Sequence, residues 1–288
     1  MTLKNELHRF TFDHHNVRGE LVQLSDTYQQ LIAGHDYPPA VAALLGELLV
    51  VTSMLTATLK FKGHINVQLQ GSGALNFATV NGSHDLSLRG VARTTGNVEE
   101  SSLQAMLGDD ALLIITLTPE QGERYQGMVK IEDNQLATAV ERYFAQSEQL
   151  PTRIWTYIDP EHNTCAGMLL QVLPGTQVDD HGYEHTVTLA DTLTTEEANQ
   201  LPAVEILRRL YHEDDVVLYP PQHVSFRCGC SRERTATALR SIARDELREI
   251  IVQDGKLTLT CDYCLTEYHY DTIDVEALDG HDAPAQSQ

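Results

Sequence analysis

The stretch AVAALLGELLVVTSMLTATLK (residues 40–60), followed by HINVQLQ (64–70), decides the fold class. The first part is apolar nearly all round at helical spacing, as expected for a helix that is buried on every side. In the second part Ile65, Val67 and Leu69 alternate with polar residues, which is the period of a half-buried strand. A buried helix followed by such a strand predicts a core in which helix and sheet pack together.

Further strands and helices are predicted around this stretch, without a regular βαβ alternation. We expect strands at residues 17–24, 75–80, 85–93, 111–117, 127–131, 153–158 and 167–173, and helices after Ser25 and at 136–148. Asn81-Gly82 lies between two alternating runs and predicts the turn of a hairpin. Intermingled helices and strands favour an α+β fold over a doubly wound sheet. We therefore expect an α+β core domain over residues 1–175.

The charge and hydropathy of the chain exclude two classes of partner. The 288 residues carry a formal net charge of -21, so like charges disfavour binding to nucleic acid or to anionic lipid. Glu47 interrupts the longest apolar stretch and leaves residues 48–59, which are fewer than the ~20 residues that span a bilayer. The first residues, MTLKNELHRF, contain no apolar signal-peptide core. We expect a cytoplasmic protein with no membrane and no nucleic-acid partner.

The composition changes after Pro174-Gly175. Residues 176–222 carry ten acidic residues against two arginines, a net charge of -8. The apolar stripe of this region is thin and runs through Val204, Leu207, Leu210 and Tyr211. We expect a helical linker over residues 176–223, and two interpretations stay open. It is either an ordinary charged connection or a metastable element that depends on the surface it packs against.

Four of the five cysteines stand near the carboxyl end, as C-x-C and C-x-x-C separated by thirty residues: Cys228, Cys230, Cys261 and Cys264. Two close pairs of thiolates suit the tetrahedral, soft coordination of Zn²⁺ and close the shell without an open position for water. We expect a zinc-binding domain over residues 224–278 and a disordered tail at 279–288. Cys165 stands alone and is expected to be a small core residue.

A site of four thiolates has two interpretations that the sequence leaves open. It can hold a small lobe together, because structural zinc contributes roughly 10–16 kcal/mol of apparent folding free energy. It can also sense oxidants, because metal-held cysteines are thiolates and oxidants attack thiolates. One residue separates Cys228 from Cys230 and two residues separate Cys261 from Cys264, so the cysteines of each pair lie within disulfide reach. Oxidation would then consume the ligands, expel the ion and unfold the lobe.

Five segments of the chain carry a resemblance to a known family. They are FRCGCSRER (226–234), ALRSIARDELREII (238–251), DGKLTLTCDYC (254–264), LKFKGHINVQLQGSG (59–73) and LRGVAR (88–93). With this spacing of C-x-C and C-x-x-C beside SRER, the sequence resembles the heat-shock protein 33 family of redox-regulated bacterial holdase chaperones. The resemblance covers nearly the whole chain.

The resemblance implies a complete switch. In the reduced, inactive monomer Cys228, Cys230, Cys261 and Cys264 would bind one Zn²⁺ per chain. Under oxidants the disulfides Cys228–Cys230 and Cys261–Cys264 would form, zinc would leave, the acidic linker would unfold and a homodimer would be favoured. The protein would then hold unfolded or partly folded client proteins without ATP, and would not be an enzyme. No G-x-x-x-x-G-K-[ST] loop occurs in the sequence, which agrees with ATP independence.

One alternative is a zinc ribbon with a purely structural site that binds nucleic acid. The region around the helical stretch 232–251 is locally basic through Arg227, Arg232, Arg234, Arg240, Arg244 and Arg248. Against this, residues 224–288 carry 7 basic and 12 acidic residues. We expect the arginines to pair with the linker or with Asp245, Glu246 and Glu249.

A second alternative is a thiol oxidoreductase that uses Cys261 and Cys264. Such enzymes place C-x-x-C at the start of a helix, where the helix dipole lowers the pKa of the thiol. Here the motif follows one predicted strand and precedes another, which disfavours that chemistry.

The thirteen histidines include two close pairs, His14-His15 and His181 with His185. No matching carboxylate or cysteine spacing accompanies either pair. We expect solvated or packing roles for them.

Overall fold

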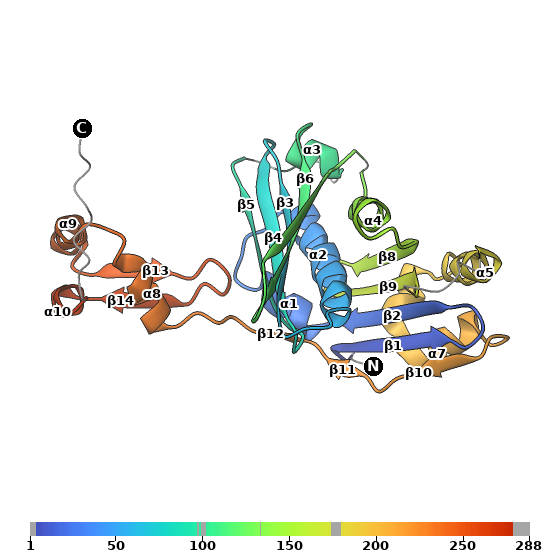
Figure 1. Ribbon diagram of the computed structural model, residues 1–288. Coiled ribbons are helices and arrows are strands. Elements are labelled where there is room, and N and C mark those ends of the chain that lie inside the picture. Colours follow the sequence, from blue (N-terminus) through green and yellow to red (C-terminus); the bar gives the residue numbers. More distant parts are fainter. Residues whose placement is uncertain (1–3, 97, 99–101, 133, 174–179, 279–288) are drawn as a thin grey trace. The chain divides into compact units, whose positions relative to one another are not determined.

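The computed structural model describes residues 4–96, 98, 102–132, 134–173 and 180–278, and divides into two compact units, Met1–Arg227 and Cys228–Gln288 (Figure 1). Residues 180–223, the described part of the expected linker, fall within the first unit. The expected domain boundary at 175/176 and the expected disordered tail at 279–288 lie outside the described residues.

Among the described residues, the first unit contains two six-stranded sheets on opposite sides of helix α2 (Pro39–Ala57). Sheet A has the order β10-β1-β2-β9-β8, with β11 also paired to β1; its strands are β1 (Glu6–Phe12), β2 (Val17–Leu24), β8 (Thr152–Asp159), β9 (Thr164–Val172), β10 (Val216–Leu218) and β11 (Gln222–His223). Sheet B has the order β12-β5-β4-β3-β6-β7; its strands are β3 (Gly63–Gln70), β4 (Leu75–Ser83), β5 (Ser87–Thr94), β6 (Leu112–Pro119), β7 (Tyr125–Lys130) and β12 (Ser225–Phe226). The strands pair antiparallel except β12, which runs parallel to β5.

Helix α2 confirms the prediction of a helix buried on every side. Pro39 occupies its first turn, where proline needs no hydrogen-bond partner. The helix is long and apolar enough to cross a membrane by length and composition, but 72% of that stretch is buried inside the unit. The helix lies between the two sheets (Figure 1), and its buried side chains belong to the core cluster that includes residues of both sheets. The α+β class is confirmed, while the separation of the strands into two sheets was not apparent from periodicity.

The other helices of the first unit cover its edges and one outer face. They are α1 (Asp26–Ile32), α3 (Leu103–Leu107), α4 (Leu136–Tyr143), α5 (Asp180–Ala190), α6 (Thr195–Gln200) and α7 (Ala203–Leu210). A π-helical turn, Phe144–Glu148, continues α4, so the helix expected at 136–148 is present in two parts.

The prediction of a turn at Asn81-Gly82 was wrong. Both residues lie inside β4, and Gly82 pairs with Ile65 on one side and Leu88 on the other. The chain reverses after Ser83, before β5. A Cβ atom on Gly82 would lie 2.2 Å from Oγ1 of Thr56 on α2. Glycine is therefore required here by the close approach of helix to sheet, and not by a turn.

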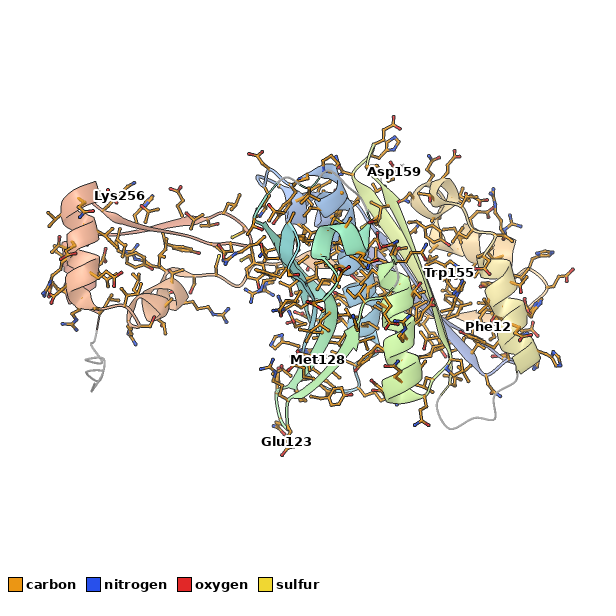
Figure 2. All side chains as sticks on the ribbon, turned by 90° about the horizontal axis from the view of Figure 1, so that it is seen from above. Phe12, Glu123, Met128, Trp155, Asp159 and Lys256 are labelled. Carbon is orange, nitrogen blue, oxygen red and sulfur yellow. The ribbon has the colours of Figure 1, made fainter. Side chains whose placement is uncertain are left out.

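The described part of the expected linker (residues 180–223, the acidic segment) contributes helices α5–α7, which pack on the face of sheet A that points away from α2. A second apolar core fills this interface, and Figure 2 shows Phe12 and Trp155 on that side of the sheet. Its buried members include Phe10, Phe12, Leu21, Met168, Ile206, Leu207 and Tyr211. Of the predicted stripe, Leu207 and Tyr211 are buried but Val204 is 58% exposed, and Ile206 takes the inward position.

Polar contacts fix the same segment to the sheet. The side chain of Gln23 donates to the carbonyl oxygens of Ala198 (2.7 Å) and Leu201 (2.8 Å). The amide of Asn199 donates to the carbonyl of Tyr157 at 3.2 Å. Helix α6 begins with a capping box between Thr194 and Glu197, which satisfies its first amides. The segment is thus folded locally and held by directed bonds as well as by its apolar side chains.

Beyond α7 the chain adds edge strands to both sheets. Strands β10 and β11 pair with β1 of sheet A, and β12 pairs with β5 of sheet B. The backbone amide of Arg227 donates to the carbonyl of Leu88 at 2.8 Å. The first unit therefore ends at the residue immediately before Cys228.

The second unit is a small helix-and-hairpin domain. Its elements are α8 (Arg232–Leu239), α9 (Arg244–Asp254), β13 (Leu257–Thr260), β14 (Glu267–Tyr270) and α10 (Thr272–Glu276). The helical stretch expected as one piece is broken between α8 and α9. There Ser241 bonds the carbonyl of Ala238 through both its amide and its hydroxyl, which ends the α-helical pattern. Leu239, Leu247, Ile251, Leu257, Tyr270, Val275 and Leu278 form its core.

Candidate metal centre

The four cysteines of the second unit sit on two tight loops. Cys228 and Cys230 precede α8, whose first turn is capped by the side chain of Ser231. Cys261 follows β13 directly, and Cys264 lies in the turn before β14. The amide of Cys261 donates to the carbonyl of Thr266 at 3.0 Å, which closes this turn. Each loop therefore presents two sulfur atoms from a backbone held by adjacent regular structure.

The structure brings all four predicted ligands together. Their Sγ atoms lie within 4.8 Å of one another. Sγ of Cys228 is 3.5 Å from Sγ of Cys261, and Sγ of Cys230 is 3.4 Å from Sγ of Cys264. In a tetrahedral site with Zn–S bonds of about 2.3 Å, neighbouring sulfurs lie about 3.8 Å apart. The cluster fits a four-coordinate soft metal with only small shifts, and all four cysteines are free thiols.

Neighbouring hydroxyl groups support the sulfur atoms. The phenol of Tyr268 on β14 donates to Sγ of Cys230 at 3.2 Å, and this hydrogen bond raises the pKa of Tyr268 to about 12, so the phenol remains a donor. The hydroxyl of Thr266 lies 3.3 Å from Sγ of Cys264. Hydrogen bonds to the sulfurs of a metal site orient the ligands. No local sequence pattern predicts these roles, because they depend on the pairing of β13 with β14.

The thiols differ in acidity. Burial raises the pKa of Cys228 to about 12 and also raises the pKa of Cys261. Burial alone would raise the pKa of Cys264, but hydrogen bonds from Thr266 and from neighbouring thiols outweigh it and lower the pKa to about 6. Without a cation, Cys264 is therefore the thiolate that forms first at neutral pH, which makes it the most reactive sulfur of these three.

Two of the arginines of the second unit, Arg232 and Arg248, form ion pairs within it. Arg232 pairs with Asp274 at 2.7 Å and lies over the ring of Tyr270. Arg248 pairs with Asp245 at 2.9 Å, as expected, and with Glu276 at 2.7 Å. These pairs use guanidinium groups that a nucleic-acid-binding helix would direct at phosphates.

Cys165 belongs to the first unit, whereas the cluster belongs to the second. It is fully buried on β9 in the core around α2, and burial raises the pKa of its thiol. A buried neutral thiol of this kind packs as a small apolar side chain.

Comparison with known proteins agrees with this architecture. The family model described as Hsp33 protein matches residues 5–271. The chain belongs to the Hsp33 family. A 33 kDa chaperonin of Yersinia pestis (strain Pestoides F) is 49% identical over 292 aligned residues, covering 100% of this chain and 99% of the relative. The 33 kDa chaperonin of Yersinia pseudotuberculosis (serotype O:1b, strain IP 31758) gives the same values.

A solved structure from Thermotoga maritima shares the fold of the family. It is a 33 kDa chaperonin, also described as a heat shock protein 33 homolog, with a TM-score of 0.81 and 19% identity. The match covers 95% of this chain and 97% of that one. Membership of the Hsp33 family identifies the present chain as a chaperone, and its four clustered cysteines are a candidate metal site.

Proposed function

We propose that this protein is a redox-regulated, ATP-independent holdase that protects thermally unfolding and oxidatively damaged proteins from aggregation in the bacterial cytoplasm. The observation that carries the proposal is the cluster of four free thiols within 4.8 Å, on a family member whose acidic segment covers an apolar sheet face. A holdase acts stoichiometrically, so we propose no catalytic residues. Its partners are unfolded or partly folded clients and, when oxidised, a second copy of the chain, with no nucleic acid and no membrane.

In the reduced state, Cys228, Cys230, Cys261 and Cys264 hold one Zn²⁺ per chain. The ion would supply charge neutralisation and a cross-link between the two loops. The second unit has only a small apolar core, so such a cross-link contributes a large share of its stability. The chain with bound metal is the inactive state in this proposal.

Oxidation pairs the thiols as Cys228–Cys230 and Cys261–Cys264. For each pair, one thiol is oxidised by a peroxide to a sulfenic acid with release of water, and the second thiol displaces another water to form the disulfide. Each disulfide thus removes two electrons from the protein and reduces one hydrogen peroxide to two waters, and the solvent supplies the two protons when the sulfurs start as zinc-bound thiolates. In the zinc-bound state all four sulfurs are thiolates, which is the form that a peroxide attacks. Disulfide sulfurs are no longer thiolate ligands, so the cross-link is lost.

The distances do not select these pairs, since the sulfur contacts of 3.5 Å and 3.4 Å join one loop to the other. The proposed pairing rests on the family resemblance. Peptide mapping of the oxidised protein tests it: Cys228–Cys230 and Cys261–Cys264 cross-links are expected. Cross-links between the loops would refute the pairing and leave thiol oxidation as the trigger.

The acidic segment links this chemistry to client binding. We propose residues 1–175 as the chaperone core, 176–223 as a metastable linker, 224–278 as the redox-switch unit and 279–288 as a disordered tail. Residues 216–226 form edge strands that lead directly to Cys228. When the second unit unfolds, this carboxyl end of the segment loses its folded anchor. Its charge of -8 over residues 176–222 then favours release from the sheet.

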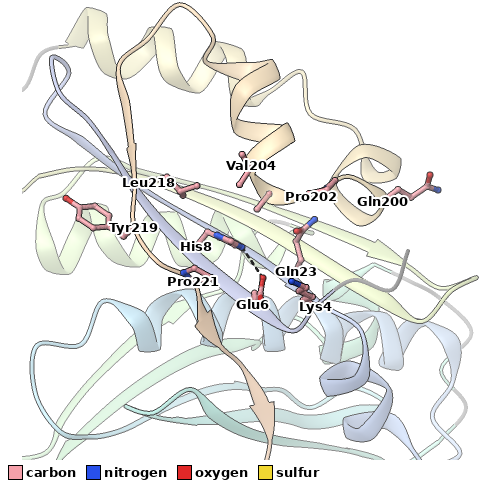
Figure 3. A pocket seen from close by; sticks show the side chains of 11 residues that line it. Lys4, Glu6, His8, Gln23, Gln200, Pro202, Val204, Leu218, Tyr219 and Pro221 are labelled. Carbon is pink, nitrogen blue, oxygen red and sulfur yellow. Dashed lines mark ion pairs between the residues drawn. The ribbon is translucent and has the colours of Figure 1, made fainter.

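Release of the linker would uncover apolar surface on both partners. The face of sheet A carries Phe10, Phe12 and Leu21, and α7 carries Ile206 and Leu207. A cavity of about 390 Å³ already opens beside α7 at the edge of the sheet (Figure 3). It lies between the first strands and Pro202, Val204 and Tyr219 of the segment, so packing there is incomplete. These features support a docked segment that separates without disrupting the core around α2.

The deciding experiment follows zinc release with a chromophoric chelator during peroxide treatment, together with the aggregation of a heat-denatured client. We expect zinc release and anti-aggregation activity to rise together. Cys261→Ser or Cys264→Ser should uncouple them, and Cys165→Ser serves as the thiol control with an intact switch. Activity that does not depend on thiol state would reject the switch and leave a structural zinc site.

A further inference from the structure

A second cluster of metal-ligating side chains lies in the first unit. His15 is in the turn between β1 and β2, His185 is on α5, and Asp214 is in the loop between α7 and β10. Their ligand atoms lie within 4.8 Å of one another. In Figure 1 the β1–β2 turn reaches the end of sheet A that α5 covers. No local sequence pattern predicts this site, because 169 residues lie between the two histidines and the carboxylate is supplied by a third segment.

The geometry is that of a preformed three-donor site. Nε2 of His15 lies 3.0 Å from Oδ1 of Asp214, and Nε2 of His185 lies 3.3 Å from Oδ2 of the same carboxylate. Two ligands at about 2.0–2.1 Å from a tetrahedral Zn²⁺ lie about 3.3 Å apart, so these spacings match. The carboxylate of Asp214 accepts hydrogen bonds from both imidazoles, which holds the three side chains together.

Burial and packing make the cluster more than a set of surface charges. The side chain of Asp214 is 8% exposed and that of His15 is 24% exposed. The ring of His15 packs beside Phe12, which in turn meets Tyr211 edge to face. His15 and Asp214 are therefore largely buried before a cation binds, so these two ligands lose little side-chain freedom on binding.

The local charge also favours a cation. The adjacent Asp215 lies 3.4 Å from His14, and its carbonyl accepts a hydrogen bond from the amide of Asp13. The chain as a whole carries a net charge of -21. Two imidazoles and one carboxylate suit borderline divalent cations and are too poor in oxygen for Ca²⁺ or Mg²⁺.

We propose that His15, His185 and Asp214 form a second metal site, distinct from the cysteine cluster, which binds a borderline divalent cation such as Zn²⁺ with water in the remaining position. Its donors come from the chaperone core and from two parts of the acidic segment. A bound cation therefore ties the segment to the sheet. Undocking of α5 must break the site, so cation binding stabilises the docked segment by mass action.

Stoichiometry in the full-length, reduced protein tests the site. Protein carrying one zinc per chain is equilibrated with micromolar ZnCl₂, and bound zinc is measured by elemental analysis. The wild type should bind two equivalents. His15→Ala and His185→Ala should keep the first and weaken binding of the second more than about tenfold, because each lacks a ligand. His162→Ala is the matched control, since His162 makes a similar imidazole–carboxylate contact with Asp159 at 2.8 Å on the β8–β9 turn.

Spectroscopy separates the two sites. Co²⁺ bound by the cysteines gives strong sulfur-to-cobalt charge-transfer absorption, whereas Co²⁺ bound by two imidazoles and a carboxylate gives weak visible bands alone. The second equivalent of Co²⁺ should add weak bands in the wild type and in His162→Ala, but not in His185→Ala. A wild type that binds one equivalent, or His variants that retain the second, would overturn the proposal. His185 is 45% exposed, so its replacement leaves the core intact.

The effect on docking has its own readout. At a free cation concentration of about 100 times the dissociation constant, hydrogen exchange of α5 amides through undocking should slow about 100-fold. His185→Ala should show no such change. This regulatory consequence rests on the proposed function, but neither zinc stoichiometry nor hydrogen exchange does. If the chain proved not to be redox-activated, the second site could still be present; if it bound no second cation, the cysteine switch would be unaffected.

Discussion

Replacing Ile206 by alanine should activate the reduced protein without any oxidant. Ile206 lies on α7 and is 1% exposed in the core between the acidic segment and sheet A. Removal of a buried isoleucine to alanine costs about 2–5 kcal/mol. This cost falls on docking, because the side chain contributes to the core beneath the segment and not to the core around α2. Since each 1.4 kcal/mol is a factor of ten, the undocked population should rise about 30-fold or more.

Val204 provides the matched control on the same helix. Its side chain is 58% exposed, so Val204→Ala removes methyl groups that are largely in contact with water. Such surface substitutions change stability by no more than about 0.5 kcal/mol. The two variants have the same overall charge and the same cysteines. Any difference between them therefore reports on docking alone.

Two measurements are needed for this prediction. Hydrogen exchange of the α7 amides in the reduced protein should be about 30-fold or more faster in Ile206→Ala than in the wild type. Suppression of the aggregation of a heat-denatured client should then appear in Ile206→Ala with its zinc retained, and not in Val204→Ala. Fast exchange with no gain in client protection would refute the view that docking hides the client surface. Unchanged exchange would refute the assigned cost of the buried side chain.

Three further changes test the structure. Tyr268→Phe removes the hydrogen bond to Cys230, so zinc should bind about 10–100-fold more weakly, as measured by competition with a chromophoric chelator. An unchanged zinc affinity would contradict the role of the Tyr268 hydroxyl in orienting the Cys230 ligand. Burial raises the pKa of Glu20 to about 8, so the folded state retains a proton that the unfolded state loses near pH 4.5. The free energy of unfolding should therefore fall as the pH rises from 4.5 to 8, by up to about 1.4 kcal/mol per pH unit. Urea unfolding at pH 5 and pH 8 should show this loss in the wild type and a smaller loss in Glu20→Gln, where the buried carboxyl of Glu47, with a pKa raised to about 7, still contributes. Gly82→Ala should cost about 1–3 kcal/mol in thermal unfolding, whereas Gly96→Ala, where no atom lies within 4 Å of the added Cβ, should not.

Periodicity was sufficient to predict the elements that carry the strongest patterns. The helix at 40–60 and the alternating strand at 64–70 are present with small shifts of their ends. Periodicity does not predict which strands belong to the same sheet. Side-chain alternation shows that one face of a strand is buried, but it does not identify the strand that pairs with it. That α2 divides the strands into two sheets depends on contacts between distant segments.

The misplaced turn shows a specific limit of local signals. Asn-Gly favours the backbone of a tight turn, but glycine is equally required where another element approaches the strand closely. At Gly82 the second requirement applies, since Thr56 of α2 leaves no room for a side chain. Sequence spacing does not distinguish these two causes.

The two candidate sites differ in how far the sequence predicts them. The four cysteines form two close pairs along the chain, and both pairs lie within the small second unit, where their sulfur atoms meet. The cluster of His15, His185 and Asp214 has no such pairing, since each ligand comes from a separate segment. Only the docking of the acidic segment on sheet A assembles it.

Residues 216–223 supply the outermost strands beside β1 of sheet A. Once this end of the linker is released, as proposed above, the outward amides and carbonyls of β1 lose partners such as Tyr219, whose backbone amide donates to the carbonyl of Arg9. An open edge of this kind is a template to which an extended polypeptide adds as a new strand. Strand addition uses hydrogen bonds to the peptide backbone, which is the same in every unfolded chain. It would allow one chaperone to bind client proteins of unrelated sequence. Each client would be released when the protein's own strands pair with the sheet again.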